Sequence, residues 1–459
     1  MNHSAWSALL QWSRLGVNAG LFLIVARHLT LTEIGAFATA FAPIRLSQVV
    51  QKSGIIDAYI ISDKAKLTQN AFFALSAILG LTFTATFALF SLILPDPLSP
   101  LMAPLSLIPL LHGVSAIHEA TLRGTLRIKA LALRTLFCQT LSAGLALMAL
   151  MAGWGAFSLV VFALINALTS SLISVAMVRI YHIALPQPAA IRAALPDILR
   201  ISTRDLAGSA TQPLLQLAVG AMLGLPAAGA FQIAARVLGL LDALAISPVR
   251  YIALPRFTAL ADSPSLPSAV LLSLRQTSLI AALVYLGALA TSPEILSVAV
   301  GPAHAASAAP LLPAFCLLGL TGALAMPLNQ ALTAISQSRL PLYRSLATLS
   351  LTAVLAAPAL THSTLATAAA LPLAAALVLA AYARIALPYL QLETRTALLT
   401  ITPALLAGVV MTIALCAAET TLQSLSPLLR LTLKAGLGTG FYVLSLTVLN
   451  YLPRHPVTP

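Results

Sequence analysis

Charge is what this sequence most conspicuously lacks. Only 8% of its 459 residues are Asp, Glu, Lys or Arg, against roughly 25% in an ordinary soluble domain. Hydrophobic residues make up 59% of the chain. So few charged side chains cannot cover the surface of a water-soluble protein of this length, which excludes the soluble globular classes. The composition predicts an all-α polytopic membrane protein.

Cysteine is also scarce. The three cysteines, Cys138, Cys316 and Cys416, lie far apart in apolar runs. No second thiol or histidine stands near them at ligand spacing, which excludes a disulfide framework and a zinc site. We therefore expect packing roles for all three, and the sequence indicates no cofactor.

The familiar catalytic and nucleotide-binding motifs are missing too. The chain contains no G-x-x-x-x-G-K-[ST] loop, no H-E-x-x-H helix and no G-x-S-x-G turn, so ATP hydrolysis and familiar hydrolytic chemistry lack support. We expect a protein that is not an enzyme. A cleavable signal peptide is not expected either, because the start of the chain lacks a basic region and its first apolar run carries Arg14.

What the sequence does contain is a series of apolar runs long enough to cross a bilayer, separated by Pro/Gly clusters or paired charges. They predict about fourteen membrane-spanning helices, near residues 9–28, 34–60, 67–94, 98–121, 131–152, 156–180, 204–224, 228–254, 268–291, 307–335, 341–360, 364–387, 396–417 and 428–452.

Basic residues cluster in alternate connections between these spans. They are Lys64 and Lys66; Arg123, Arg127, Lys129 and Arg134; Arg179, Arg192, Arg200 and Arg204; Arg250, Arg256 and Arg275; Arg339 and Arg344; Arg384 and Arg395; and Arg454. The other connections, such as LPDPLSP and GLPAAG, carry none. The positive-inside rule then predicts that both termini and the basic loops are cytoplasmic. The net charge of +13 is thus a topology signal, and no nucleic-acid partner is indicated.

An internal repeat relates the two halves of the chain. Residues 24–46 align without gaps over 218–240 and share the pattern L-x-L-x-x-x-G-A-F. The identical pairs are Val25 and Val219, Leu29 and Leu223, Leu31 and Leu225, Gly35 and Gly229, Ala36 and Ala230, Phe37 and Phe231, Ala40 and Ala234, and Leu46 and Leu240. Six spans separate the copies, which keeps their orientation the same and is typical of parallel repeats in transporters.

The repeat predicts two pseudo-symmetric six-helix lobes plus two C-terminal helices. We expect an N-lobe at residues 1–182 with spans 1–6, a cytoplasmic linker at 183–203, a C-lobe at 204–389 with spans 7–12, and additional spans 13 and 14 at 390–459.

Polar side chains recur on the first helix pair of each predicted lobe. Arg45 and Lys52 are two helical turns apart with Gln48 between them, so the three share a face of span 2. The other polar stripes are Gln11, Arg14 and Asn18 on span 1, Gln212 and Gln216 on span 7, and Gln232 and Arg236 on span 8. A charge near the bilayer centre costs roughly 2.5–3.5 kcal/mol, so it normally faces a cavity or a partner. We expect these ten polar groups to line a water-filled cavity that binds substrate.

A plainer interpretation stays open for the same residues. Arg45 would cap carbonyls near Pro43, while Lys52 and Arg14 would reach the membrane surface. Asp242, six positions after Arg236, is a candidate proton or sodium site or simply a partner for another helix.

A proton relay of His112, His118 and Glu119 on span 4 is a weaker hypothesis, because histidine titrates near neutral pH but Glu119 is spaced to pair with Arg123 at i, i+4.

Several stretches carry a family resemblance when taken in order: ARHLTLTEIGAFATA, EATLRGTLRIKALALRTL, GWGAFSLV, GLPAAGAFQIAARV, YIALPRFTAL and TSPEILSVAVGPAHAASAAPLLPAF. Over about residues 8–345 the sequence resembles bacterial polysaccharide exporters of the multidrug/oligosaccharidyl-lipid/polysaccharide (MOP) superfamily, the Wzx-type flippases of lipid-linked oligosaccharides. The resemblance implies a multi-pass protein of the bacterial inner membrane. It implies alternating-access transport of a polyprenyl-pyrophosphate-linked oligosaccharide to the periplasmic leaflet, for O-antigen, capsule or exopolysaccharide synthesis. Membrane lipid is an implied partner, and association with polymerase or glycosyltransferase machinery is left open.

The basic stripe suits such a cargo, since arginine offers forked donors and lysine a point charge to a pyrophosphate. Three other interpretations remain open. A multidrug or organic-cation antiporter of the same superfamily should have an acidic, aromatic cavity. A membrane glycan polymerase or ligase needs a sizeable extracytoplasmic loop, whereas the longest here is about 291–306. A passive structural or assembly protein would leave the polar stripes unexplained.

Overall fold

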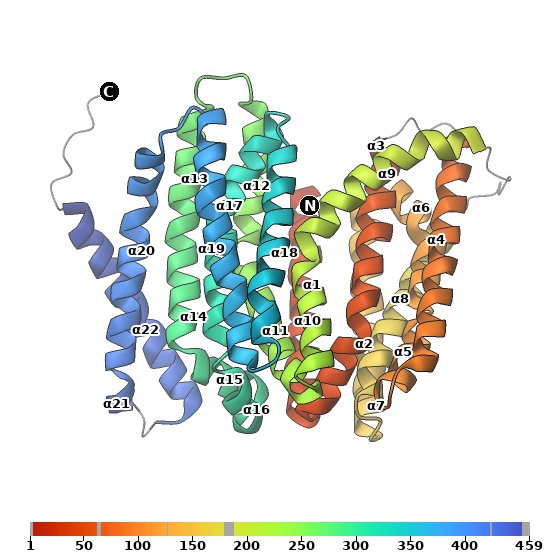
Figure 1. The fold of residues 1–459 in the computed structure, drawn as a ribbon, viewed down its shortest axis with the longest axis horizontal. Helices are drawn as coiled ribbons and strands as arrows, with labels where there is room; N and C mark the ends of the chain where they lie inside the picture. Colours follow the sequence, from red (N-terminus) through yellow and green to blue (C-terminus); the bar gives the residue numbers. More distant parts are fainter. Residues whose placement is uncertain (1–2, 62–65, 126, 179–187, 423–424, 452–459) are drawn as a thin grey trace. The chain divides into compact units, whose positions relative to one another are not determined.

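The computed structural model describes residues 3–61, 66–125, 127–178, 188–422 and 425–451, and every regular element in these ranges is a helix (Figure 1). Eleven helices within the described residues are long and apolar enough to cross a membrane. The three remaining expected spans coincide with helical stretches at 3–28, 31–61 and 188–222. The prediction of an all-α polytopic membrane protein is therefore confirmed.

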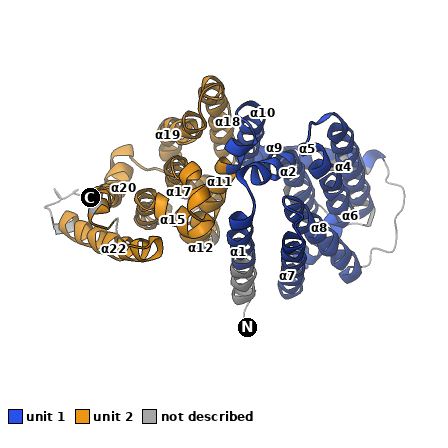
Figure 2. Cartoon of the chain, turned by 90° about the horizontal axis from the view of Figure 1, so that it is seen from below, with its two compact units in different colours: residues 1–229 blue, residues 230–459 orange. Residues whose placement is uncertain are grey.

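The chain divides into two compact units, Met1–Gly229 and Ala230–Pro459 (Figure 2). The two units are defined by which helices pack together, whereas the predicted boundaries at 182, 203 and 389 come from the internal repeat. The units therefore do not test those boundaries, which stay a prediction. Of the predicted linker, residues 183–187 lie outside the described residues, and 188–203 form the first part of helix α9.

Unit 1 contains the helices of the first half of the chain. They are α1 (His3–His28), α2 (Leu31–Val49), the π-helix η1 (Val50–Ile55), α3 (Ile56–Ile61), α4 (Lys66–Ile93), α5 (Leu98–Leu105), α6 (Ile108–Gly124), α7 (Ile128–Met151), α8 (Phe157–Met177), α9 (Pro188–Ser209), α10 (Thr211–Met222) and the start of α11 (Leu225–Ala245). One buried cluster, with Ile44 and Met102 at its centre, joins α2, α5, α6 and α8. A second, with Phe72, Ile117 and Ile201, holds α9 against α3, α4 and α6.

Unit 2 contains the remainder of α11 and the helices that follow. They are α12 (Ser247–Ala259), α13 (Leu266–Ala281), the π-helix η2 (Ala282–Leu286), α14 (Gly287–Ala290), α15 (Ser292–Val300), α16 (Pro302–Ala308), α17 (Leu312–Ala334), α18 (Arg339–Ala359), α19 (Thr364–Tyr389), α20 (Thr394–Ala417), α21 (Glu419–Leu422) and α22 (Pro427–Tyr451). Its core includes an edge-to-face pair of Phe231 and Phe315 with ring centroids 4.9 Å apart. Large apolar side chains such as Leu92 in unit 1 and Ile413 in unit 2 remain exposed, as a lipid-facing surface requires.

The first copy of the repeat begins α2 with a capping box. The Thr30 hydroxyl accepts from the Glu33 amide at 3.3 Å, and the Glu33 carboxylate accepts from the Thr30 amide at 2.8 Å. This arrangement satisfies two backbone donors that the helix start would otherwise leave unpaired, and such a cap is worth about 1 kcal/mol. The helix that carries Arg45 and Lys52 is therefore fixed at its first turn.

The two copies of the repeat contact each other within unit 1 through their shared glycines. A Cβ atom added to Gly35 would lie 2.8 Å from the Gly229 nitrogen, and one added to Gly229 would lie 2.8 Å from the Leu31 carbonyl carbon. Gly35 also meets the carbonyl of Leu225, the repeat equivalent of Leu31. The contact is thus reciprocal, and only glycine permits two backbones to approach this closely.

Span 2 changes its winding where α9 crosses it. The π-helix η1 contains Gly54, and a Cβ there would lie 3.1 Å from the Ser202 Cβ of α9. On its buried side, Gln51 donates from Nε2 to the Pro109 carbonyl of α6 at 2.8 Å. Such π-helical turns are frequent at functional sites. Here the turn lets α9 approach span 2 and form the second wall of the cavity described next.

Candidate functional site

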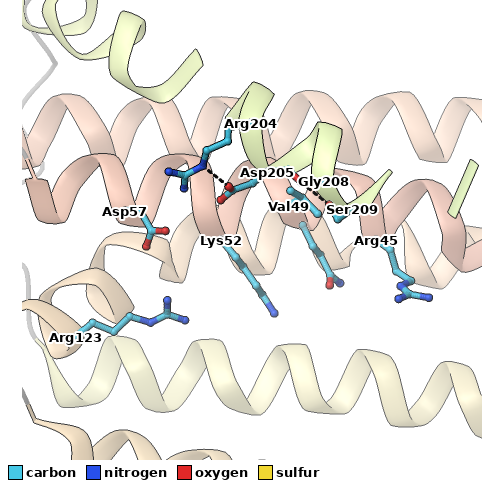
Figure 3. A pocket seen from close by; sticks show the side chains of 10 residues that line it. Arg45, Val49, Lys52, Asp57, Arg123, Arg204, Asp205, Gly208 and Ser209 are labelled. Carbon is cyan, nitrogen blue, oxygen red and sulfur yellow. Dashed lines mark hydrogen bonds and ion pairs between the residues drawn. The ribbon is translucent and has the colours of Figure 1, made fainter. Parts of the chain in front are cut away.

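A cavity of about 590 Å³ lies within unit 1, in the size range of small-molecule sites. Its lining comes from α2, η1, α3, α6 and α9, and consists of Arg45, Gln48, Val49, Lys52, Asp57, Arg123, Arg204, Asp205, Gly208 and Ser209 (Figure 3). Lys52, Asp57 and Arg123 lie in the halves of their spans that the basic loops predict to be cytoplasmic, and Arg45 lies near the middle of span 2.

Three of the residues singled out by sequence spacing share one wall of this cavity. Arg45 and Gln48 come from the last turns of α2, and Lys52 follows in η1. Figure 3 shows Arg45 and Lys52 extending from the same side of span 2, with Arg123 reaching in from α6 below Asp57 in that view. The structure thus places these three residues together, while their role in binding stays a prediction.

The cavity carries a surplus of positive charge. Four cations, Arg45, Lys52, Arg123 and Arg204, line it together with two carboxylates, Asp57 and Asp205. Arg204 is already paired, since its Nε lies 2.8 Å from Asp205 Oδ1. Among the described residues no carboxylate lies within ion-pair distance of the exposed Arg45 side chain. Arg45 is therefore well suited to receive the negative charge of a ligand.

Sequence reasoning missed the α9 side of this cavity. Arg204 counts as a basic loop residue in the sequence, and neither Asp205 nor Ser209 is predicted to have a role. A single sequence does not show that α9 continues through Pro196 and covers span 2. Asp57 was also missed, although its position one to two turns beyond Lys52 on the same span is a signal that was available.

A buried charged network adjoins the cavity through Arg123. Arg123 Nη2 lies 2.6 Å from Glu119 Oε1, which confirms the ion pair expected from their i, i+4 spacing. The other carboxylate oxygen, Oε2, lies 3.3 Å from Nη2 of Arg134 on α7, and Arg134 also donates to the Ser174 hydroxyl of α8. We call Glu119, Arg123, Arg134 and Ser174 the Glu119 cluster.

The other predicted residues of unit 1 whose side chains the structure describes do not line this cavity. Asn18 is half-buried on α1, and the side chain of Arg14 lies outside the described residues. Gln212 is half-buried on α10. Gln216 is only 4% exposed and donates from Nε2 to the Ala228 carbonyl at 3.0 Å, which ties α10 to the start of α11. Their part in substrate binding stays a prediction.

The predicted residues of unit 2 lie on α11. Gln232 is half-buried and Arg236 exposed. Asp242 accepts a hydrogen bond from the Tyr285 hydroxyl of η2, so this carboxylate has a polar partner within its own unit. Its role in ion coupling stays a prediction. The described residues contain no group of three or more side chains suited to hold a metal ion.

Unit 2 also contains a charged cluster that sequence reasoning missed. Lys434 of α22 lies 2.7 Å from Glu294 Oε1 of α15 and also contacts Glu419 of α21. Arg430 lies 3.7 Å from Glu294 and 3.5 Å from Glu419. We call these four residues the Lys434 cluster. Lys434 is fully buried, so the cluster ties the last span to α15, the short helix after span 9, and to α21, the short helix after span 13.

Comparisons with known proteins agree with this architecture. A family model described as "Polysaccharide biosynthesis protein" matches residues 24–309. No curated protein sequence matches the chain significantly. The solved structure "Lipid II flippase MurJ, inward closed conformation" is similar with a TM-score of 0.79 and 12% identity, over 97% of this chain and 98% of the other.

Two MATE structures are also similar. An inward-facing MATE family transporter of the MOP superfamily matches with a TM-score of 0.66 and 13% identity, over 85% of this chain and 98% of the other. A MATE structure in complex with MaL6 matches with a TM-score of 0.52 and 15% identity, over 83% of this chain and 94% of the other. At such identities the likeness is one of fold.

Proposed function

This chain belongs to the family of polysaccharide biosynthesis proteins, and from that premise we propose that it is a flippase for a polyprenyl-pyrophosphate-linked oligosaccharide. The cargo would move from the cytoplasmic to the periplasmic leaflet of a bacterial inner membrane by alternating access. Both chain termini would be cytoplasmic, as the basic loops predict. The protein would act as a secondary transporter and would not modify its glycan.

The observation that carries this proposal is the charge of the unit 1 cavity. A pyrophosphate is a compact polyanion, and it can enter the membrane region only where cations replace its hydration. Arg45 and Lys52 offer such cations from one wall, and Arg123 and Arg204 from the others. Because two carboxylates offset part of this charge, the site would bind a diphosphate without holding it so tightly that it could not leave.

The neutral polar groups of the cavity suit the sugar part of the cargo. Gln48 and Ser209 line the cavity beside the cations and can hydrogen-bond sugar hydroxyls. That Arg14, Asn18, Gln212, Gln216, Gln232 and Arg236, on the first two helices of each predicted lobe, also take part in binding stays a prediction. The prenyl chain would remain in lipid.

The main alternative is an organic-cation antiporter, since MATE transporters share the fold. Sites for organic cations favour carboxylates and aromatic faces. The ten residues that line the cavity include no aromatic side chain, and their cations outnumber their carboxylates. The sign of the cavity therefore favours an anionic cargo.

The test is transport by the purified full chain in proteoliposomes. A polyprenyl-pyrophosphate-linked oligosaccharide on one leaflet is followed by its accessibility to a membrane-impermeant lectin, and uptake of an organic cation is measured in parallel. We expect translocation of the lipid-linked sugar only. Arg45→Ala should slow it about tenfold or more, the scale of losing charge-assisted hydrogen bonds.

The matched control is Arg200→Ala on α9, whose side chain is 74% exposed and pairs with Asp197 on the same helix. It should transport normally. Cation uptake without lipid-linked sugar movement, or normal transport by Arg45→Ala, would refute the proposal. Collapsing proton and sodium gradients separately, with Asp242→Asn beside the unaltered chain, would identify the coupling ion.

A further inference from the structure

The Glu119 cluster is built unevenly around one carboxylate. Glu119 is shared by two guanidinium groups, Arg123 on one oxygen at 2.6 Å and Arg134 on the other at 3.3 Å. The two arginines differ in exposure: the side chain of Arg134 is 3% exposed, whereas that of Arg123 is 37% exposed and lines the cavity. One arginine therefore faces the protein interior and the other faces the site.

A single carboxylate cannot neutralise two guanidinium groups, so the cluster keeps one net positive charge. Arg134 is occupied internally, because it also donates to Ser174 and is enclosed between α7 and α8. The surplus is consequently presented at Arg123, the member that reaches the cavity. Of the five N–H donors of that guanidinium, Glu119 engages one terminal nitrogen, and the fork remains able to bind phosphate oxygens.

We infer that Glu119 is a positioning residue for anion binding: it holds Arg123 in the binding pose before the headgroup arrives, and Arg134 keeps Glu119 from cancelling the charge of Arg123. This inference rests on the proposed function and adds to it the residue that fixes the conformation of the Arg123 side chain in the cavity. A long arginine side chain loses much rotamer freedom when a ligand fixes it. An arginine already fixed by Glu119 binds with a smaller loss.

Two simpler explanations of Glu119 predict other results for its removal than positioning does. If Glu119 acts only through its charge, its removal should strengthen anion binding, because a negative group leaves the neighbourhood of the site. If Glu119 is only a structural ion-pair partner, its removal should lower stability and leave the affinity of the folded protein unchanged. Positioning predicts weaker anion binding despite the added positive charge.

The experiment measures binding of inorganic pyrophosphate and farnesyl pyrophosphate to the purified full chain in lipid nanodiscs by isothermal titration calorimetry. Glu119→Gln preserves the size and one hydrogen-bond acceptor of the side chain. We expect it to weaken binding about fivefold to tenfold, the scale of the net contribution of one ordinary hydrogen bond. In an Arg123→Ala background the same change should alter affinity less than about twofold, because there is no guanidinium left to position.

Glu119→Asp serves as the second variant if Glu119→Gln does not fold, since it keeps the charge and withdraws the carboxylate by one methylene group. It should fold and show an intermediate loss of affinity. Tighter or unchanged binding in Glu119→Gln, or an equal effect with and without Arg123, overturns the inference. The proposed function fails separately if Arg45→Ala binds both probes as tightly as the unaltered chain does while Glu119→Gln still binds them more weakly.

Discussion

The two charged clusters of this protein use similar side chains to different ends. In unit 1 the Glu119 cluster sets one carboxylate against two arginines. In unit 2 the Lys434 cluster sets two carboxylates, Glu294 and Glu419, against two cations. The first keeps a net charge and reaches a cavity through Arg123. The second is balanced and encloses its lysine completely.

Charge balance and enclosure together therefore separate a structural cluster from a binding one. Buried ions tolerate removal from water only when paired, so a neutral set built around an enclosed lysine is a device for holding helices together. A set with surplus charge at an exposed member retains the capacity to pair with something else.

Removing the buried lysine should have the largest effect. Lys434→Met leaves Glu294 and Glu419 close together with only the more distant Arg430 to compensate them. Breaking a buried ion set in this way costs about 3–5 kcal/mol. Thermal unfolding of the full chain in detergent should show this as a marked drop in melting temperature. Pyrophosphate binding by the fraction that remains folded should not change.

The control for this prediction restores the balance of the cluster. Lys434→Met combined with Glu294→Gln leaves one carboxylate, Glu419, facing one cation, Arg430, at 3.5 Å. The double variant should be more stable than Lys434→Met alone, even though it carries one more substitution. A double variant that is less stable than Lys434→Met would show that the stability of this cluster depends on its individual contacts and not on its charge balance.

Removing the buried cation of the Glu119 cluster, Arg134, should lower stability less than Lys434→Met does, but it should also lower pyrophosphate affinity. Arg134→Met leaves Glu119 still paired with Arg123 at 2.6 Å, so no charge is abandoned in the interior. We expect a loss of about 2 kcal/mol, mainly from the buried contact with Ser174 and from packing. Pyrophosphate affinity should also fall, because the full charge of Glu119 then offsets that of Arg123 and is no longer shared with Arg134. Paired melting and calorimetry measurements would check both parts, and unchanged affinity would contradict the comparison.

Salt should distinguish the clusters without any substitution. Charges that face a wet cavity are screened when the Debye length falls from about 10 Å at 0.1 M to about 3 Å at 1 M salt. Pyrophosphate affinity should therefore decrease several-fold over this range. The stability difference between Lys434→Met and the unaltered chain should stay nearly constant, because Lys434 is fully enclosed. A strong salt dependence of that difference would mean that water and ions reach Lys434 itself.

Much of the fold could be predicted because its determinants are local. Long apolar runs predicted the helices, and the bilayer permits few alternatives. The glycines of the repeat were visible as a pattern, and the structure adds that Gly35 and Gly229 meet each other's backbones. The wall formed by Arg45, Gln48 and Lys52 followed from helical spacing along a single span.

The missed parts depend on contacts between distant segments. The partners of Lys434 are 140 and 15 positions away in the chain, and neither distance leaves a periodic signal. Arg204 and Asp205 enter the cavity only because α9 packs on η1 at Gly54. A single sequence shows which residues are polar within a span, but it does not show which other helix supplies the opposite wall.

The smallest predicted effects come from changing the shape of a cation while keeping its charge. Arg430 lies 3.5 Å and 3.7 Å from its carboxylates and its side chain is 19% exposed, so Arg430→Lys should cost no more than about 0.5–1 kcal/mol of stability. Arg123→Lys should leave stability nearly unchanged and weaken pyrophosphate binding about threefold, because lysine lacks the fork that can contact Glu119 and a phosphate at once. If both substitutions changed only stability, or both changed only affinity, the proposed difference between the structural Lys434 cluster and the anion-binding Glu119 cluster would be wrong.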